Sequence, residues 1–292
     1  MAKAPDCCPP GSLPRPASHS GYQQKGQDTM VDDIPVYVSG SPGPRGVVLY
    51  QEIFGLNSGN LKRICDELAA AGFFAVMMDN FRGKVCPEDG AIGKGSMTVK
   101  LINPPRSGPL ACLAMTLGPY IPGCCLPALP PMAATLKEAS TFFRQFPYST
   151  VIGPDTEKVL KWMEAKGCTS VGAMGFCWGV WALCKASAEG LPFKCGVGPH
   201  PSTQVEAIFG NEKEMIDKVR MPVLLMAAGN DPPILRPGGD IAEALVKKGG
   251  TSKWFPEMKH GWMGRGDTSK PDVRRDFEEG MRLTIAHFNQ HL

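Results

Sequence analysis

The chain has 292 residues, of which 43% are hydrophobic and 20% charged, so it has enough apolar material for a core and too little charge for a disordered protein. A formal net charge of +3 is too small to indicate nucleic acid or an anionic membrane as the partner. Eleven cysteines, with no signal-like apolar run at the N-terminus, argue against a secreted disulfide scaffold, and we expect a cytoplasmic protein.

Residues 1–30 are rich in Pro, Ser, Gly and Gln and show little periodicity, which predicts a loosely ordered lead-in to a domain at 31–292. Cys7 and Cys8 lie within this lead-in, in the segment CCPPGS. Such a pair could bind a metal ion or take part in redox chemistry. Because the sequence has no Cys-x-x-Cys pair, we expect no metal and no cofactor.

The first regular elements alternate between strand and helix. Residues 46–53 form a short apolar run with a polar end, and residues 61–71 have apolar side chains at helical spacing, with Gly72 as the cap. Residues 73–78 are a second apolar run. Uninterrupted apolar strands separated by a helix predict a parallel sheet that is covered on both faces.

The stretch from about 84 to 153 interrupts this alternation. It is rich in proline and carries no charged residue from Ser107 to Leu136. Prolines remove the hydrogen-bond donors that a helix in hydrocarbon needs, so we do not expect a membrane span. An ordered lid, a disordered insertion and an error in the gene model are the open alternatives, and we favour a poorly ordered insertion.

The alternation resumes after residue 150 and continues to the C-terminus. The expected elements are a helix at 156–165, a strand at 170–174, a helix at 178–187, strands at 195–198 and 223–227, a helix at 241–247, a strand at 252–255 and a helix at 272–289. This pattern predicts a doubly wound α/β domain with a mostly parallel sheet and right-handed crossovers.

The strongest local signal is the segment GFCWG at Gly175–Gly179, between an expected strand and an expected helix. It is a G-x-nucleophile-x-G elbow with Cys177 as the nucleophile, in which the two glycines relieve crowding around a strained backbone. The elbow places the thiol at a helix N-terminus, whose dipole favours the thiolate. The alternative is a small, buried and inert cysteine in a glycine-rich turn.

Two further residues follow expected strands in the order that an α/β-hydrolase triad requires. Asp231 follows the strand at 223–227, and His260 follows the strand at 252–255. Asp231 would fix the imidazole tautomer, and His260 would exchange protons with the Cys177 sulfur or with water. Considered alone, Asp231 would more often be a turn former and His260 a structural histidine.

These motifs resemble those of the dienelactone hydrolases, or carboxymethylenebutenolidases. The segment QEIFGLN at Gln51–Asn57 is very similar to the QEIFG-x-N segment of that family, and GFCWG, Asp231 and His260 match its elbow, acid and base. CCPPGS and the GFCWG elbow resemble the eukaryotic branch of the family. The resemblance, over residues 30–83 and 154–290, implies the α/β-hydrolase fold and hydrolysis of a lactone or small carboxylic ester.

The resemblance also implies roles for neighbouring residues. Glu52 corresponds to a glutamate that contacts the nucleophilic thiol and takes up its proton as substrate binds. The backbone N–H groups of Ile53 and Trp178 correspond to the oxyanion hole of the family. Without the resemblance, Glu52 would be interpreted as an ordinary acid at the end of a strand.

Substrate recognition leaves alternatives open. Family members that act on dienelactone use arginines to grip the substrate carboxylate, and Arg82 and Arg265 lie close to those places. Either could instead be a solvated loop arginine, and His200 could line the pocket or be structural.

The leading hypothesis is therefore hydrolysis of a small-molecule lactone or ester through a thioester on Cys177, without a nucleic-acid or membrane partner. The alternative is a catalytically weak hydrolase-like protein that acts as a binding or thiol redox-sensing module.

Overall fold

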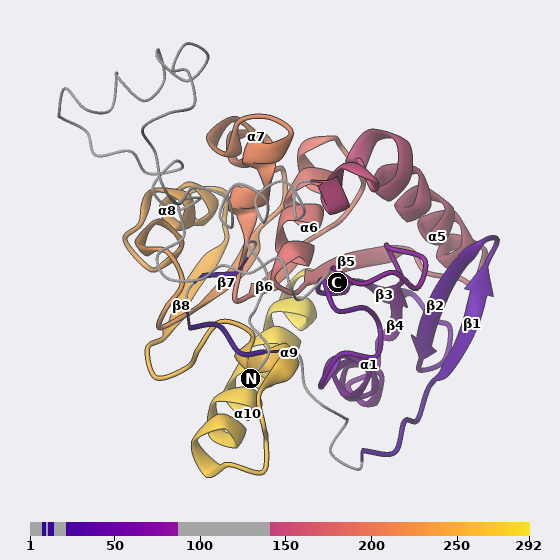
Figure 1. The fold of residues 1–292 in the computed structure, drawn as a ribbon. Coiled ribbons are helices and arrows are strands. Elements are labelled where there is room, and N and C mark those ends of the chain that lie inside the picture. The colour runs from indigo at the N-terminus through magenta and orange to yellow at the C-terminus, as the bar shows by residue number, and fades with distance from the viewer. Residues whose placement is uncertain (1–7, 10, 15–21, 87–140) are drawn as a thin grey trace, which may run out of the picture.

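The computed structural model of the protein describes residues 8–9, 11–14, 22–86 and 141–292 (Figure 1). Within these residues, eight strands form one sheet in the order β1-β2-β4-β3-β5-β6-β7-β8. The β1–β2 and β2–β4 pairs are antiparallel, and the remaining pairs are parallel. The mostly parallel sheet with helices confirms the predicted fold class.

The described part of the chain begins with three consecutive strands, after which strands and helices mostly alternate. The strands are β1 (Gln27–Val31), β2 (Ile34–Ser39), β3 (Arg45–Tyr50), β4 (Phe74–Met78), β5 (Ser170–Gly175), β6 (Gly196–Pro199), β7 (Val223–Ala228) and β8 (Thr251–Phe255). The helices are α1 (Leu61–Ala70), α5 (Gly153–Ala165), α6 (Trp178–Ala188), α7 (Glu212–Lys218), α8 (Asp240–Val246), α9 (Trp262–Arg265) and α10 (Pro271–His291). Shorter helical turns are η1 (Tyr148–Ile152), η2 (Thr203–Ile208) and η3 (Pro233–Leu235).

The helices lie in two layers on opposite faces of the sheet. Helices α1 and α10 lie on one face, and α5, α6, α7 and α8 lie on the other (Figure 1). Successive residues of the central strands therefore enter different cores: Val76 of β4 packs with the second layer and Met77 with the first. Because both faces are covered, the central strands are apolar throughout, which is the physical basis of the pattern in the sequence.

The structure differs from the expected lead-in at residues 1–30. Strand β1 pairs with β2, although the first four of its residues are exposed and its polar side chains give no strand periodicity. Cys8 is also buried, with 2% of its surface exposed. Part of the lead-in is thus held against the domain. Residues 1–7, 10 and 15–21 lie outside the described residues.

Most of the expected insertion, residues 87–140, lies outside the described part of the chain. Its C-terminal end is packed rather than loose, because Phe142, Phe143 and Phe146 are buried against the domain. The Phe142 ring lies 4.9 Å from the ring of Phe81, and Phe143 stacks on Trp178 with ring centres 6.4 Å apart. The wall beside the elbow is therefore built partly from this aromatic segment.

Within the described residues, no helix combines the length and the apolar character that crossing a membrane requires.

Candidate active site

Cys177 lies at the junction between β5 and α6. Its backbone has φ +54° and ψ −114°, a strained combination for a residue with a side chain. A Cβ atom on Gly175 would clash with the carbonyl oxygen of Gly179, and a Cβ atom on Gly179 would clash with that of Tyr50. No side chain fits at either place, which explains the glycine on each side of the elbow.

Asp231 and His260 form a buried pair on the loops that follow the neighbouring strands β7 and β8. Asp231 Oδ1 lies 2.6 Å from His260 Nδ1, and neither side chain has exposed surface. Asp231 Oδ2 accepts a hydrogen bond of 2.6 Å from the backbone N–H of Ala228. The side-chain oxygen of Asn230 accepts the N–H of His260 at 2.6 Å and so joins the two loops.

The imidazole of His260 lies against two thiols. One donor atom each from Cys8, Cys177 and His260 lie within 4.8 Å of one another. Because Nδ1 is paired with Asp231, Nε2 is the ring atom available for proton exchange, and it has no hydrogen-bond partner among the described residues. Burial opposes protonation of the ring, but Asp231 and the two thiols outweigh it and raise the pKa of His260 well above its ordinary value.

Glu52 and Arg265 form a second buried pair beside these residues. Arg265 Nη1 lies 2.7 Å from Glu52 Oε2, and neither side chain is exposed. Burial raises the pKa of Glu52 to about 7, and neighbouring Cys177 adds to the rise, although Arg265 opposes it. The carboxylate of Glu52 thus forms an ion pair with Arg265, a partner that the family likeness did not imply. A carboxyl group with this pKa can hold or release a proton near neutral pH.

Ile53 and Trp178 occupy equivalent positions after the paired parallel strands β3 and β5. Tyr50 of β3 pairs with Gly175 of β5, and each of the two residues follows its strand end by three positions. Ile53 lies in the turn closed by the hydrogen bond from the Gly55 N–H to the Glu52 carbonyl. Trp178 is the first residue of α6, where a helical N–H has no acceptor within the helix. Both residues thus lie directly after neighbouring strands of the sheet, close to the elbow.

His200 and Ser202 follow β6 and lie beside the same cluster. The ring centres of His200 and His260 are 5.1 Å apart, and Ser202 Oγ lies 3.5 Å from Cys177 Sγ. Burial, followed by the nearby charges of His260 and Arg265, lowers the pKa of His200 well below its ordinary value, so its ring is neutral. His200 therefore lies in the wall of the site, next to His260. The place of His200 after a strand was its signal in the sequence, whereas Ser202 was not among the predicted site residues.

Cys8 is a residue at this site whose position the sequence did not reveal. Its Sγ lies 3.5 Å from Cys177 Sγ, although 169 positions separate the two residues. The N–H of Leu13 donates a hydrogen bond of 2.9 Å to the carbonyl of His260 and holds the same segment in place. The motif CCPPGS drew attention to this cysteine, but no local pattern indicates such a distant partner.

The same three donors could serve as metal ligands. Two thiolates and an imidazole are ligands that Zn²⁺ accepts. The Asp231 carboxylate faces the other ring nitrogen of His260, and a zinc-binding histidine often has a carboxylate at that position. The expectation of no metal rested on the absence of a local cysteine motif, whereas these donors meet only through the fold.

Arg82 is not brought to this cluster. Its guanidinium pairs with Asp155 at 2.9 Å and with Asp33 at 3.2 Å. A guanidinium held between two carboxylates is poorly placed to bind a substrate carboxylate.

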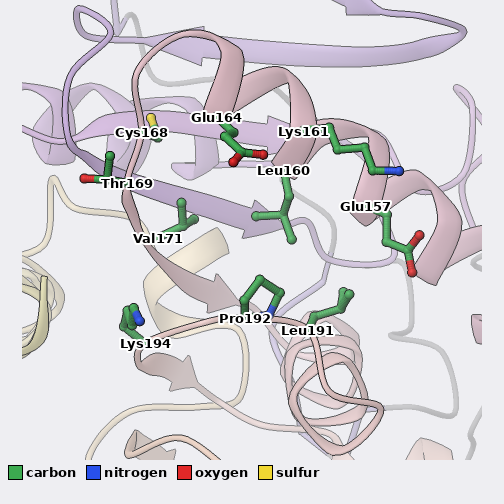
Figure 2. Close-up of a pocket in the computed structure, with 10 residues that line it drawn as sticks. All are labelled: Glu157, Leu160, Lys161, Glu164, Cys168, Thr169, Val171, Leu191, Pro192 and Lys194. Atoms are coloured by element: carbon green, nitrogen blue, oxygen red, sulfur yellow. The ribbon is translucent and has the colours of Figure 1, made fainter.

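A separate hollow of about 500 Å³ lies beside α5 and the first residues of β5 (Figure 2). Its lining mixes apolar side chains such as Leu160 and Val171 with charged ones such as Glu157 and Lys194. Because Cys177 follows the other end of β5, this hollow is distinct from the candidate active site.

The dienelactone hydrolase family model matches residues 34–292. The hydrolase pyvD of Aspergillus violaceofuscus is 26% identical over 298 residues, which cover 98% of this chain and 96% of the relative. The hydrolase tropI of Talaromyces stipitatus is 24% identical over 303 residues, which cover 100% and 99% of the two chains. Both relatives are fungal, in agreement with the eukaryotic branch that the motifs resemble.

Solved structures show the same fold at low identity. A Klebsiella pneumoniae protein assigned to the dienelactone hydrolases superposes with a TM-score of 0.58 at 16% identity, covering 92% of this chain and 100% of that one. A cold-adapted esterase from an Arctic intertidal metagenomic library superposes with a TM-score of 0.52 at 16% identity, covering 92% and 94%. At this level of identity the likeness concerns the fold alone.

Proposed function

This chain belongs to the dienelactone hydrolase family, and we propose that its hydrolase activity cleaves a lactone or a small carboxylic ester with Cys177 as the nucleophile. The observation that carries the proposal is the buried contact of 2.6 Å between Asp231 and His260, with the His260 and Cys177 donor atoms within 4.8 Å of each other. This arrangement supports the roles of Cys177 as the nucleophile, His260 as the base and Asp231 as the residue that orients the base.

The reaction has two steps. The Cys177 sulfur attacks the substrate carbonyl carbon, and the C–O bond of the ester breaks as His260 protonates the leaving alkoxide, which leaves a thioester on Cys177. His260 then takes a proton from water, and the resulting hydroxide attacks the thioester carbonyl carbon. The C–S bond breaks, the carboxylic acid is released, and the Cys177 sulfur regains its proton from Glu52. For a lactone, the alcohol and the acid belong to one product molecule.

The neighbouring groups have supporting roles in this proposal. The N–H groups of Ile53 and Trp178 stabilise the oxyanion that forms in each step. Glu52, whose pKa burial raises to about 7, accepts the thiol proton when substrate arrives. Arg265 pairs with Glu52 and keeps its carboxyl group in place, and His200 forms part of the pocket wall.

Access to the nucleophile requires a movement. Cys177 has no exposed surface, and the Cys8 sulfur lies 3.5 Å from its own sulfur. A substrate carbonyl must occupy the space next to the Cys177 sulfur, so Cys8 must move aside before the reaction begins.

The test is hydrolysis of p-nitrophenyl acetate and of a dienelactone by purified protein and by two alanine variants. Cys177→Ala should lower kcat/KM by at least about a thousandfold, because the nucleophile is lost. The matched control is Cys184→Ala, which removes a buried thiol from α6 whose pKa burial raises to about 12 and which is therefore unreactive. This control should keep its activity. Equal hydrolysis by the wild type and Cys177→Ala would overturn the proposal.

A further inference from the structure

We propose that Cys8 and Cys177 form a reversible oxidation site, at which a hydroperoxide such as hydrogen peroxide converts the two thiols into a disulfide. The bond would tie the N-terminal segment, meaning residues 8–9 and 11–14, across the active site. This inference goes beyond hydrolysis, and its principal readout does not depend on the enzyme's activity.

The two sulfur atoms are already in contact. Their separation is 3.5 Å, and both side chains are buried, with 2% of Cys8 and none of Cys177 exposed. A disulfide bond is about 2.05 Å long, so the sulfurs need to approach by about 1.5 Å. Cys8 lies outside regular secondary structure, which allows its backbone and side chain to make this adjustment more easily than a residue within the sheet.

Each thiol of the pair has a cationic partner. His260, paired with Asp231, lies beside Cys177, and Arg265 lies beside Cys8. Burial alone would lower the pKa of Arg265, but Glu52, Cys8 and Cys177 outweigh it and raise that pKa. These two groups can stabilise the negative charge that a sulfur atom carries when it attacks a peroxide or a sulfenic acid.

Other buried cysteines lack this environment. Burial raises the pKa of Cys184 to about 12 and has the same effect on Cys195. Their thiols stay protonated and unreactive at neutral pH, so oxidation should be selective for the Cys8–Cys177 pair.

The chemistry balances with one peroxide. The Cys177 thiolate attacks a peroxide oxygen, the O–O bond breaks, and a sulfenic acid forms while hydroxide leaves and becomes water. The Cys8 thiolate then attacks the sulfenic sulfur, the S–S bond forms, the S–O bond breaks, and a second water leaves. Two thiols are oxidised by two electrons in total, and the peroxide is reduced to water.

The disulfide would close the site against substrate. The segment is held to the His260 loop by the Leu13 N–H, and Leu13 and Pro14 border a hollow of about 540 Å³ that also reaches Arg265. In the reduced protein the segment can move away from Cys177, whereas the disulfide fixes Cys8 where the substrate carbonyl would lie. Arg265 also opposes a metal cation beside Cys8, which favours oxidation over metal binding as the role of this pair.

The experiment treats the full-length protein with hydrogen peroxide, blocks the remaining thiols, and maps the digested peptides by mass spectrometry. We expect the Cys8 peptide linked to the Cys177 peptide, and faster migration on a non-reducing gel because the bond joins residues 169 positions apart. Hydrolysis of p-nitrophenyl acetate should be lost on oxidation and return with dithiothreitol.

Two serine variants separate this pairing from others. In Cys8→Ser the linked peptide should be absent, and Cys177 should proceed to sulfinic acid, which dithiothreitol does not reverse. In Cys7→Ser, the neighbouring cysteine in the sequence, the link should form as in the wild type. Wild-type protein in which Cys177 becomes sulfinic acid, stays reduced or links to another cysteine would overturn the proposal. A link in protein that hydrolyses no ester would refute the proposed function and leave the oxidation site standing.

Discussion

Asp231→Asn tests how the carboxylate orients His260. The backbone N–H of Ala228 donates to Asp231 Oδ2 at 2.6 Å, so in the variant the amide oxygen must occupy that position. The amide nitrogen then faces His260 Nδ1, which the native Oδ1 meets at 2.6 Å. Since an N–H donor now faces Nδ1, that ring atom must lose its proton, and the proton moves to Nε2. An imidazole protonated there cannot accept the proton of the water molecule that attacks the thioester.

The expected loss follows from this wrong tautomer. In a serine triad the same substitution lowers turnover by about 10⁴. A thiol loses its proton more readily than a hydroxyl group, so a cysteine enzyme depends less on the base, and we expect a fall of about 10³ in kcat/KM, or about 4 kcal/mol of transition-state stabilisation. The pKa of His260 should also fall, because the Asp231 charge that raises it is gone.

The assay is hydrolysis of p-nitrophenyl acetate, with thermal unfolding measured in parallel to show that the variant is folded. Asp217→Asn is the matched control, since it makes the same change on the surface helix α7, where Asp217 pairs with Lys213. The control should retain wild-type rates. A folded Asp231→Asn protein with kcat/KM within about threefold of wild type would refute the tautomer argument.

Two further predictions concern stability. Burial raises the pKa of Glu52 from 4.5 to about 7, so the protonated carboxyl group stabilises the fold fully below pH 4.5, and this stabilisation is lost as the pH rises to 7. Between these pH values the free energy of unfolding, measured with urea, should fall by about 3 kcal/mol more in the wild type than in Glu52→Gln. Parallel curves of unfolding free energy against pH for the two proteins would contradict this. Because the φ of Cys177 is +54°, Cys177→Gly should be more stable than Cys177→Ala by about 1–2 kcal/mol. Inside α6 the order should reverse, with Cys184→Gly less stable than Cys184→Ala by about 1 kcal/mol. If glycine is the less stable substitution at both positions, the strain at the elbow is refuted.

Local patterns in the sequence were enough for the fold class and for the order of its main elements. Strands such as Phe74–Met78 are apolar throughout because both faces of the sheet are covered, and that pattern needs no knowledge of distant contacts. The GFCWG elbow is equally local, because Gly175 and Gly179 are required by backbone atoms that lie close to them. The exposed strand β1 was missed because its polar residues follow no apolar period.

The partners of the two candidate arginines, Arg82 and Arg265, could not be predicted from local sequence. Arg82 and Arg265 both follow strands and have similar surroundings in the sequence. Arg82 pairs with Asp33 and Asp155, whereas Arg265 is buried against Glu52. A long side chain is directed by whichever charges the fold places within its reach, so its role depends on segments far away along the chain.

The sequence alone determined the class of fold, the strained elbow at Cys177 and the order of Asp231 and His260, because periodicity, glycine geometry and strand ends are properties of short segments. Only the tertiary structure decided that Cys8 lies 3.5 Å from Cys177 and that Glu52 faces Arg265. These contacts join segments far apart in the chain, and such pairs are selected by the packing of the whole domain rather than by any local preference.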